Sequence, residues 1–375
     1  MWLILLSLEI LLILYKYKHL VIYLYQFLYL KWYAKFSYQY VHQYFEKLTS
    51  LYPNRICLYY NFRKYTYSNL NDLSNRMAHY ILSTYNLLKY DDVAIMSDNQ
   101  PSFICWWLAM SKINVRTSLI NSSMRGKSLA HCINLTSSKI ILVQEHYIQH
   151  IHNILPLLHN KNIIMISLAD DNYDSISYPT NCIQSLCSSF SNKNITLTSN
   201  NNNIRYNYKN DDILYYIFTS GTTGLPKASP IKHSRFFLSG AFFGIFHHIN
   251  ESDIIYNTLP IYHSVGGMIG ISLSWFSNAP LVLRNKFSAS QFIPDCIHYN
   301  CTVMLYIGQL CKYLLQVPNK ITDQKHNIKK ALGNGLRRVL HPYINTNTYL
   351  AVLFALSPAV NNAKATESTL KFAVT

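Results

Sequence analysis

The run from Thr219 to Lys227, Thr-Ser-Gly-Thr-Thr-Gly-Leu-Pro-Lys, combines the residue types that bind phosphate groups. Its two glycines let the backbone approach an anion closely and point several N–H groups at it. Its hydroxyl side chains add hydrogen-bond donors, and its lysine adds a positive charge. The run is not a Walker loop, because the spacing G-x-x-x-x-G-K-[ST] is absent. It predicts a polyphosphate site made of Thr219, Ser220, Gly221, Thr222, Thr223, Gly224 and Lys227.

The alternative for this run is an ordinary polar turn, in which Gly-Thr-Thr-Gly is common. The residues before it decide between the two. Ile213 to Phe218 is an apolar, β-branched and aromatic run that predicts a buried strand leading straight into the glycines. A complete nine-residue loop directly after a buried strand favours the phosphate site.

The body of the chain alternates between predicted strands and helices, which indicates an α/β fold whose sheets are covered by helices. An amphipathic helix is expected over Phe36–Tyr52, and a polar linker over 188–211. The predicted helices that follow are one after Leu70, Pro101–Ser111, Ser128–Leu135 and a His-rich helix from Glu145. The predicted strands are Asp92–Met96, Val115–Ile120, Lys139–Val143, Ile163–Leu168, Ile213–Phe218, Ile254–Leu259, Pro280–Leu283 and Thr302–Tyr306.

Several further segments support a specific family. They are Ala109–Asn114, Ser118–Asn121, His131–Cys132, Leu259–Ser264, Lys286–Phe292, Tyr306–Leu315 and Ala331–Arg337. Together with the loop, they resemble the fatty acid transport proteins, which are also very-long-chain acyl-CoA synthetases of the adenylate-forming superfamily. The resemblance runs from about Tyr65 to Arg337.

This resemblance implies the large N-terminal domain of the adenylate-forming fold, with layered sheets and covering helices, over residues 36–337. It also implies a two-step ligase. A long-chain or very-long-chain fatty acid attacks Mg-ATP to form an acyl-adenylate, and CoA then displaces AMP. The matching loop would hold the β- and γ-phosphates. Gly333, Asn334 and Gly335 match the stretch that lies along the adenine. Lys227 and His263 would be the catalytic residues, with Tyr262 beside them.

Beyond Arg337 the resemblance fails. The family would present a magnesium-binding glutamate, a Thr-Gly-Asp segment for the ribose, a hinge arginine and a small C-terminal lid. Residues 338–375 read instead as a divergent tail without that lid. Only Ala365-Thr366-Glu367 repeats part of the magnesium motif, so Glu367 is the candidate metal ligand. Two functions therefore stay open: an acyl-CoA ligase, or a non-catalytic membrane protein that binds nucleotide or fatty acid.

The first 35 residues predict a membrane anchor. Trp2 to Leu14 and Leu20 to Leu30 are apolar or aromatic. By the positive-inside rule the main body lies in the cytosol, because four lysines all lie downstream of the first apolar run: Lys16, Lys18, Lys31 and Lys35. The expected location is the membrane of the endoplasmic reticulum or the plasma membrane. The alternative is a hydrophobic helix docked on the protein's own surface.

The net charge of +16 comes from 33 Lys and Arg against 17 Asp and Glu. No run of five basic residues occurs, so no nucleic-acid partner is expected. The eight cysteines form no CxxC pair and are predicted to be buried reduced thiols. His146 and His150 lie one helical turn apart, but they lack the HExxH order and predict a solvated helix face.

Overall fold

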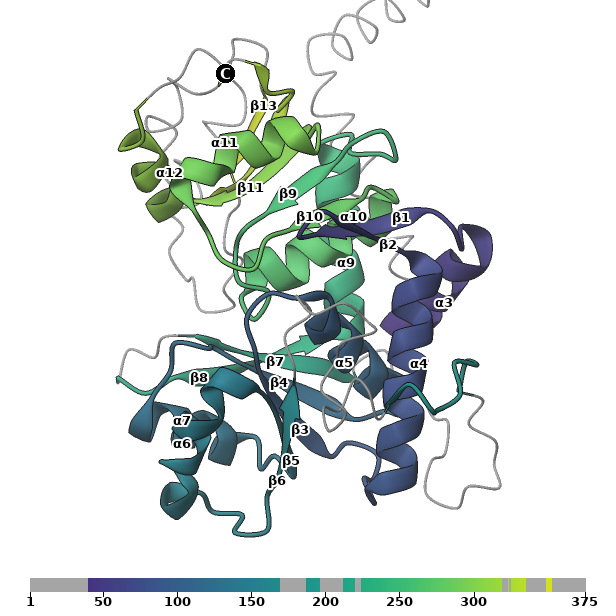
Figure 1. Cartoon of the computed structure of the whole chain (residues 1–375), viewed down its shortest axis with the longest axis vertical. Coiled ribbons are helices and arrows are strands. Elements are labelled where there is room, and N and C mark those ends of the chain that lie inside the picture. The colour runs from purple at the N-terminus through teal and green to yellow at the C-terminus, as the bar shows by residue number, and fades with distance from the viewer. Residues whose placement is uncertain are drawn as a thin grey trace, which may run out of the picture.

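The computed structural model describes residues 40–168, 187–195, 212–219, 224–318, 323, 325–334 and 349–352. Two sheets form its framework (Figure 1). The expected anchor over residues 1–35 lies outside these ranges. Among the helices within them, none has the length and apolar character needed to cross a bilayer.

The six-stranded sheet contains most of the strands predicted from the first half of the chain. Its order is β6-β5-β3-β4-β7-β8, and all neighbours are parallel except β7 and β8. The strands are β3 (Asp92–Met96), β4 (Arg116–Ile120), β5 (Ile140–Gln144), β6 (Ile164–Leu168), β7 (Ile213–Thr219) and β8 (Lys227–Lys232). The sequence prediction missed β8, whose run Lys-Ala-Ser-Pro-Ile-Lys has Ile231 as its one strong strand former and also contains a proline.

The seven-stranded sheet has the order β13-β12-β11-β9-β10-β1-β2, and only β1 and β2 pair antiparallel. Its strands are β1 (Ile56–Tyr60), β2 (Arg63–Thr66), β9 (Ile255–Asn257), β10 (Leu281–Leu283), β11 (Val303–Ile307), β12 (Lys330–Asn334) and β13 (Tyr349–Val352). β13 comes from the segment expected to be a divergent tail, yet it extends this sheet.

Helices between the sheets build the larger core (Figure 1). They are α3 (Val41–Leu51), α4 (Tyr67–Thr84), α5 (Pro101–Lys112), α9 (His233–Phe246) and α10 (Ser272–Ser277). Every residue of α5 is buried, because protein surrounds this helix on all sides. α4 begins where the side chain of Thr66 caps it by accepting from the backbone N–H of Asn69 at 3.2 Å.

Strand β3 shows why the six-stranded sheet must be covered on both faces. Val93 and Ile95 point into the larger core, whereas Ala94 and Met96 point into a second core. This alternation follows from the two-residue period of a strand. The second core lies under α6 (Gly126–Leu135) and α7 (Ile148–His152), while α11 (Ala289–His298) and α12 (Gly308–Leu315) follow β10 and β11 of the other sheet (Figure 1).

Most predicted elements are confirmed, and the bounds of the predicted strands agree with the observed ones to within two residues. The helix predicted from Phe36 begins at Val41, and the one predicted after Leu70 begins at Tyr67. The His-rich helix is shorter than expected: a 3-10 turn over Glu145–Tyr147 precedes the five-residue α7. Part of the polar linker is also held in place, because residues 187–195 lie along α4. The amide of Asn75 donates to the Asn192 carbonyl at 2.8 Å and to Asn194 Oδ1 at 2.9 Å.

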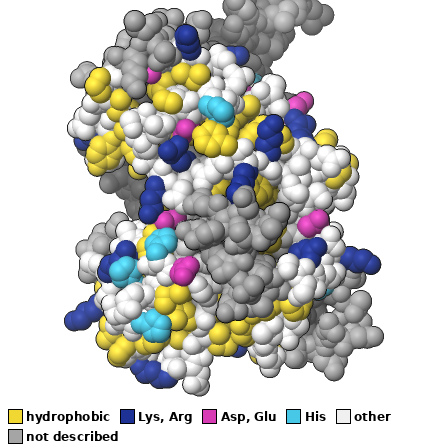
Figure 2. All heavy atoms as spheres, in the orientation of Figure 1, with side chains coloured by type: hydrophobic (Ala, Val, Ile, Leu, Met, Phe, Trp, Pro, Cys, Tyr) yellow, Lys and Arg dark blue, Asp and Glu magenta, His cyan; other side chains and the backbone are white. Residues whose placement is uncertain are grey.

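The seven cysteines within the described ranges are all buried and free, as predicted. On the face shown in Figure 2, basic side chains are scattered singly among neutral and acidic ones. Charge on this face is therefore dispersed and not collected into one basic surface.

Candidate active site

The carboxyl ends of the parallel strands in the two sheets meet. In one sheet β3, β4, β5 and β7 end at the same edge, and in the other β9, β10, β11 and β12 do so. The amide of Asn99, just after β3, donates to the carbonyl oxygen of Leu259, just after β9, at 2.9 Å. The two edges therefore face each other. Such a crevice at the carboxyl ends of parallel strands is where α/β proteins bind ligands.

The predicted phosphate loop connects β7 to β8 at this edge. Thr219 and Lys227 lie opposite each other in the antiparallel pair, and both are exposed. Gly224 has a φ of 89°, which only glycine adopts without strain. The structure thus places Thr219, Gly224 and Lys227 at one hairpin end. The other predicted members, Ser220, Gly221, Thr222 and Thr223, lie outside the described residues.

Helix α6 holds the end of the hairpin. The Nε2 atom of His131 lies 3.0 Å from the carbonyl oxygen of Pro226, directly before Lys227. As a donor, this imidazole satisfies a carbonyl at the start of β8 and limits how far the lysine backbone can move. His131 is one of the residues that the sequence resemblance included, although no role was predicted for it.

The predicted His263 motif lies on the opposite edge. Residues Leu259 to His263 form the turn after β9, and a π-helix from Ser264 to Ile271 follows at once. The N–H of Gly267 donates to the carbonyl of His263 at 2.8 Å. π-Helical turns are rare and occur often at functional sites. The turn and the π-helix together present His263 at the surface of this edge.

The tyrosines at this edge, Tyr262 and Tyr147, are buried, whereas His263 is exposed at its surface. Burial lowers the pKa of His263 below its ordinary value, although part of the residue remains exposed. Burial raises the pKa of Tyr262, and it raises the pKa of Tyr147 to about 12. The rings of Tyr262 and His263 lie 4.8 Å apart. The lowered pKa favours the uncharged, hydrogen-bonding form of His263.

The predicted adenine-binding stretch ends β12. Gly333 is opposite Tyr306 in β11, and a Cβ atom on it would lie 2.0 Å from the Tyr306 carbonyl oxygen. Packing between these strands therefore requires a glycine, whatever else the residue does. Asn334 pairs with Ile307 at the same strand end. Gly335 and the candidate magnesium ligand Glu367 lie outside the described residues.

Within the described ranges, no group of three or more His, Cys, Asp or Glu side chains could hold a metal ion. The buried carboxylate at this edge belongs to Asp98, and its Oδ2 atom already lies 3.1 Å from Lys286 and 3.3 Å from His146. His146 therefore pairs with an acid and is not a freely solvated side chain.

The sequence interpretation missed two polar residues at the centre of the facing edges, Asp98 and Asn99. They come just after β3, separated from it by Ser97, and both are buried. A signal was present: an acid and an amide next to the carboxyl end of a strand that is apolar after Asp92. Nothing in the sequence indicated that their partners come from the other sheet.

Comparison with known proteins supports the same fold. The family model of the AMP-binding enzymes matches residues 45–360. Long-chain fatty acid transport protein 1 of Homo sapiens is 33% identical over 273 residues, which is 73% of this chain and 41% of that protein. The chain thus spans about two fifths of the length of this curated relative.

Two solved structures show the fold. The inhibitor-bound N-terminal domain of FACL13 from Mycobacterium tuberculosis superposes with a TM-score of 0.72 at 16% identity, covering 85% of this chain and 76% of that one. ATP-bound MatB from Rhodopseudomonas palustris gives a TM-score of 0.68 at 18% identity, covering 83% of this chain and 58% of that one.

Proposed function

The chain belongs to the AMP-binding enzyme family. We propose that it functions as a fatty acid–CoA ligase linked to fatty acid uptake. A long-chain or very-long-chain fatty acid carboxylate would attack the α-phosphate of ATP, and pyrophosphate would leave. The thiol of CoA would then displace AMP from the acyl-adenylate. The relative named above, a long-chain fatty acid transport protein, supports this substrate class.

One observation carries this proposal: the Thr219–Lys227 hairpin and the Leu259–His263 turn end on facing edges of two sheets. The reaction needs no protein nucleophile, so its rate depends on positioning and on neutralising charge. Lys227, exposed at the hairpin end, would supply positive charge to the phosphates. His263 would act as a neutral hydrogen-bond partner near the reacting groups, because its pKa is lowered.

The remaining ligand assignments are also proposals. Gly333, Asn334 and Gly335 would lie along the adenine, and the backbone N–H groups of the glycine loop would hold the phosphates. Mg²⁺ accompanies ATP in such reactions and would neutralise phosphate charge when bound. Glu367 is the proposed ligand of this Mg²⁺ ion. The roles proposed for Lys227 and His263 do not depend on the ion. The apolar segment before residue 36 supports a location at a cellular membrane, with the α/β domain facing the cytosol.

Fatty-acid-dependent exchange of labelled pyrophosphate into ATP tests the proposal on this chain. We expect exchange that requires a long-chain fatty acid. We also expect Lys227→Ala to lower it by about a hundredfold or more, because one positioned charge in such a site contributes that much. Lys127→Ala is the matched control, since Lys127 is an exposed lysine on the neighbouring helix α6. It should exchange at the unmodified rate.

Nucleotide binding without any exchange would overturn the ligase proposal for this chain. It would instead favour the alternative, a non-catalytic membrane protein that binds nucleotide or fatty acid. An equal loss in Lys127→Ala would show that general surface charge matters and that the hairpin lysine has no special role.

A further inference from the structure

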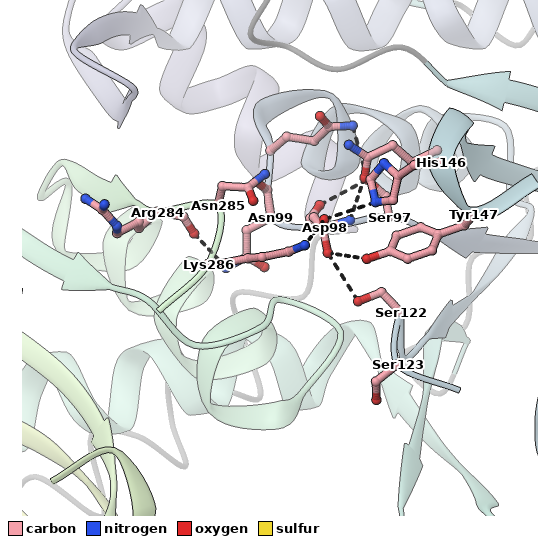
Figure 3. A network of polar contacts seen from close by, with 12 residues as sticks. Ser97, Asp98, Asn99, Ser122, Ser123, His146, Tyr147, Arg284, Asn285 and Lys286 are labelled. Atoms are coloured by element: carbon pink, nitrogen blue, oxygen red, sulfur yellow. Dashed lines mark hydrogen bonds and ion pairs between the residues drawn. The ribbon is translucent and has the colours of Figure 1, made fainter. Parts of the chain in front are cut away.

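Two adjacent residues, Asp98 and Asn99, connect the facing edges of the two sheets (Figure 3). They follow β3 of the six-stranded sheet, and their side chains contact the segments after β9 and β10 of the seven-stranded sheet. Asn99 is 3% exposed and Asp98 6%. The contacts between them and the other sheet are therefore largely shielded from water.

The amide of Asn99 binds both segments of the other sheet at once. Its Nδ2 atom donates to the carbonyl of Leu259 at 2.9 Å and to that of Arg284 at 3.0 Å. Its Oδ1 atom accepts from the N–H of Ile261 at 2.8 Å. Leu259 and Ile261 belong to the turn that ends in His263, so this one side chain sets the height of that turn above β3.

The carboxylate of Asp98 forms the second connection. On its own side, Oδ1 accepts from the hydroxyl of Tyr147 at 2.7 Å and from that of Ser122 at 3.3 Å. Across the gap, Oδ2 lies 3.1 Å from the ammonium group of Lys286, which follows β10 (Figure 3). Neighbouring groups from two segments, those after β4 and β5, thus fix the carboxylate before it meets the lysine.

Polar groups in this position are costly to leave unpaired. A buried donor or acceptor that loses its partner destabilises the fold more than the loss of a surface ion pair does. Lys286 is 66% exposed, so the Asn99 connection is the stronger of the two. The distance between the edges depends mainly on the amide.

We propose that Asp98 and Asn99 form an inter-sheet clamp that positions the His263 turn against the phosphate hairpin. They are positioning residues and touch no reacting atom. The hairpin belongs to the same sheet as the clamp, two strands away from β3, which is about 10 Å. Loss of the clamp therefore displaces the opposite wall of the site and leaves the hairpin in place.

The kinetic part of this inference rests on the proposed function. A displacement of about 1 Å costs roughly a hundredfold in rate. We expect Asn99→Ser to lower kcat for pyrophosphate exchange by about that factor, with KM for ATP changed by about twofold or less because the hairpin is intact. The matched control is Asn75→Ser. Asn75 is a fully buried asparagine of α4 that also makes two amide hydrogen bonds, far from this edge.

The structural part needs no activity. The N–H of Ile261 is buried and bonded to Asn99, so it should exchange slowly with deuterium. In Asn99→Ser the peptide containing residues 259–263 should exchange about tenfold faster under conditions where the variant stays folded. In Asn75→Ser the same peptide should exchange at the original rate.

A second variant covers the case in which Asn99→Ser does not fold. Asp98→Asn keeps the size of the side chain but removes its charge and replaces one acceptor oxygen by an NH2 donor. The Lys286 connection is then lost, and kcat should fall about two- to fivefold. Unchanged kcat in the clamp variants, or an equal fall in Asn75→Ser, overturns the proposal. If the unmodified chain shows no pyrophosphate exchange, the proposed function fails, and amide exchange alone decides on the clamp. Faster amide exchange of the 259–263 peptide in Asn99→Ser alone supports the clamp, and equal amide exchange in Asn99→Ser and the unmodified chain refutes it.

Discussion

Replacing Gly267 by alanine tests whether the His263 turn must pack tightly on the π-helix. A Cβ atom at position 267 would lie 1.9 Å from the carbonyl oxygen of Ile261 and 2.9 Å from its carbonyl carbon. An ordinary contact begins at 3.4 Å, so the two backbones must separate by about 1.5 Å. Both partners are main-chain atoms, and no side chain can rotate away to make room.

The same separation has two measurable consequences. Overpacking of this kind costs about 1–3 kcal/mol of unfolding free energy. Because the shift moves the turn that carries His263, pyrophosphate exchange should also fall by about a hundredfold. Urea unfolding gives the first quantity, and fatty-acid-dependent exchange at saturating ATP gives the second.

The variant Ile81→Val distinguishes the effect of lower fold stability from the effect of displacing the His263 turn. Ile81 is a fully buried residue of α4, and losing one methylene there costs about 0.5–1.5 kcal/mol. This variant should be less stable and yet catalyse pyrophosphate exchange at the unmodified rate. Wild-type stability and exchange in Gly267→Ala would refute the geometric reasoning. A similar loss of exchange in Ile81→Val would assign the effect to stability alone.

Two further predictions concern buried titratable groups. Burial lowers the pKa of His233 to about 3, and its Nδ1 accepts from the N–H of Val41 at 3.1 Å, so between pH 3 and 6.5 the unfolded chain binds the extra proton. As the pH is lowered from 6.5, this group should therefore reduce the unfolding free energy by about 1.4 kcal/mol per pH unit. Measured against pH, the unfolding free energy of His233→Asn should show a flatter slope. An unchanged slope would contradict the assignment. Lys112 is 1% exposed and pairs with Glu46 at 2.5 Å, so Glu46→Gln should cost about 3 kcal/mol by leaving a buried charge unpaired. Adding Lys112→Met should restore most of that loss in a urea double-mutant cycle, and full additivity of the two changes would rule out the pairing.

Strands and helices were predictable where one local pattern decides the structure. Asp92–Met96 is a short apolar run, and it forms a strand buried on both faces. Pro101 opens an apolar helix at its first position, where proline's missing N–H is not needed. Local patterns failed where the tertiary context decided. β8 pairs with β7 despite Pro230 and two terminal lysines, because the hairpin register brings Thr219 opposite Lys227.

The phosphate hairpin and the His263 turn were both predicted as site segments from their residue types. Their roles remain proposals, but their positions follow from strand direction. Each comes directly after a parallel strand, and parallel strands end at one edge of a sheet. The structure adds the reason for two local choices: Gly224 adopts a positive φ, and Gly333 avoids the carbonyl of Tyr306.

From its residues alone, the chain determined most of its strands, and it predicts which segment binds phosphate, since hydrophobic period and residue type act over a few neighbours. Only the tertiary structure decided which of these segments meet. Asn99 and Leu259 are 160 residues apart in the chain, and their hydrogen bond exists because two separate sheets pack with their carboxyl edges face to face. No local pattern encodes such a pairing, because it depends on how helices such as α5 fill the space between the sheets.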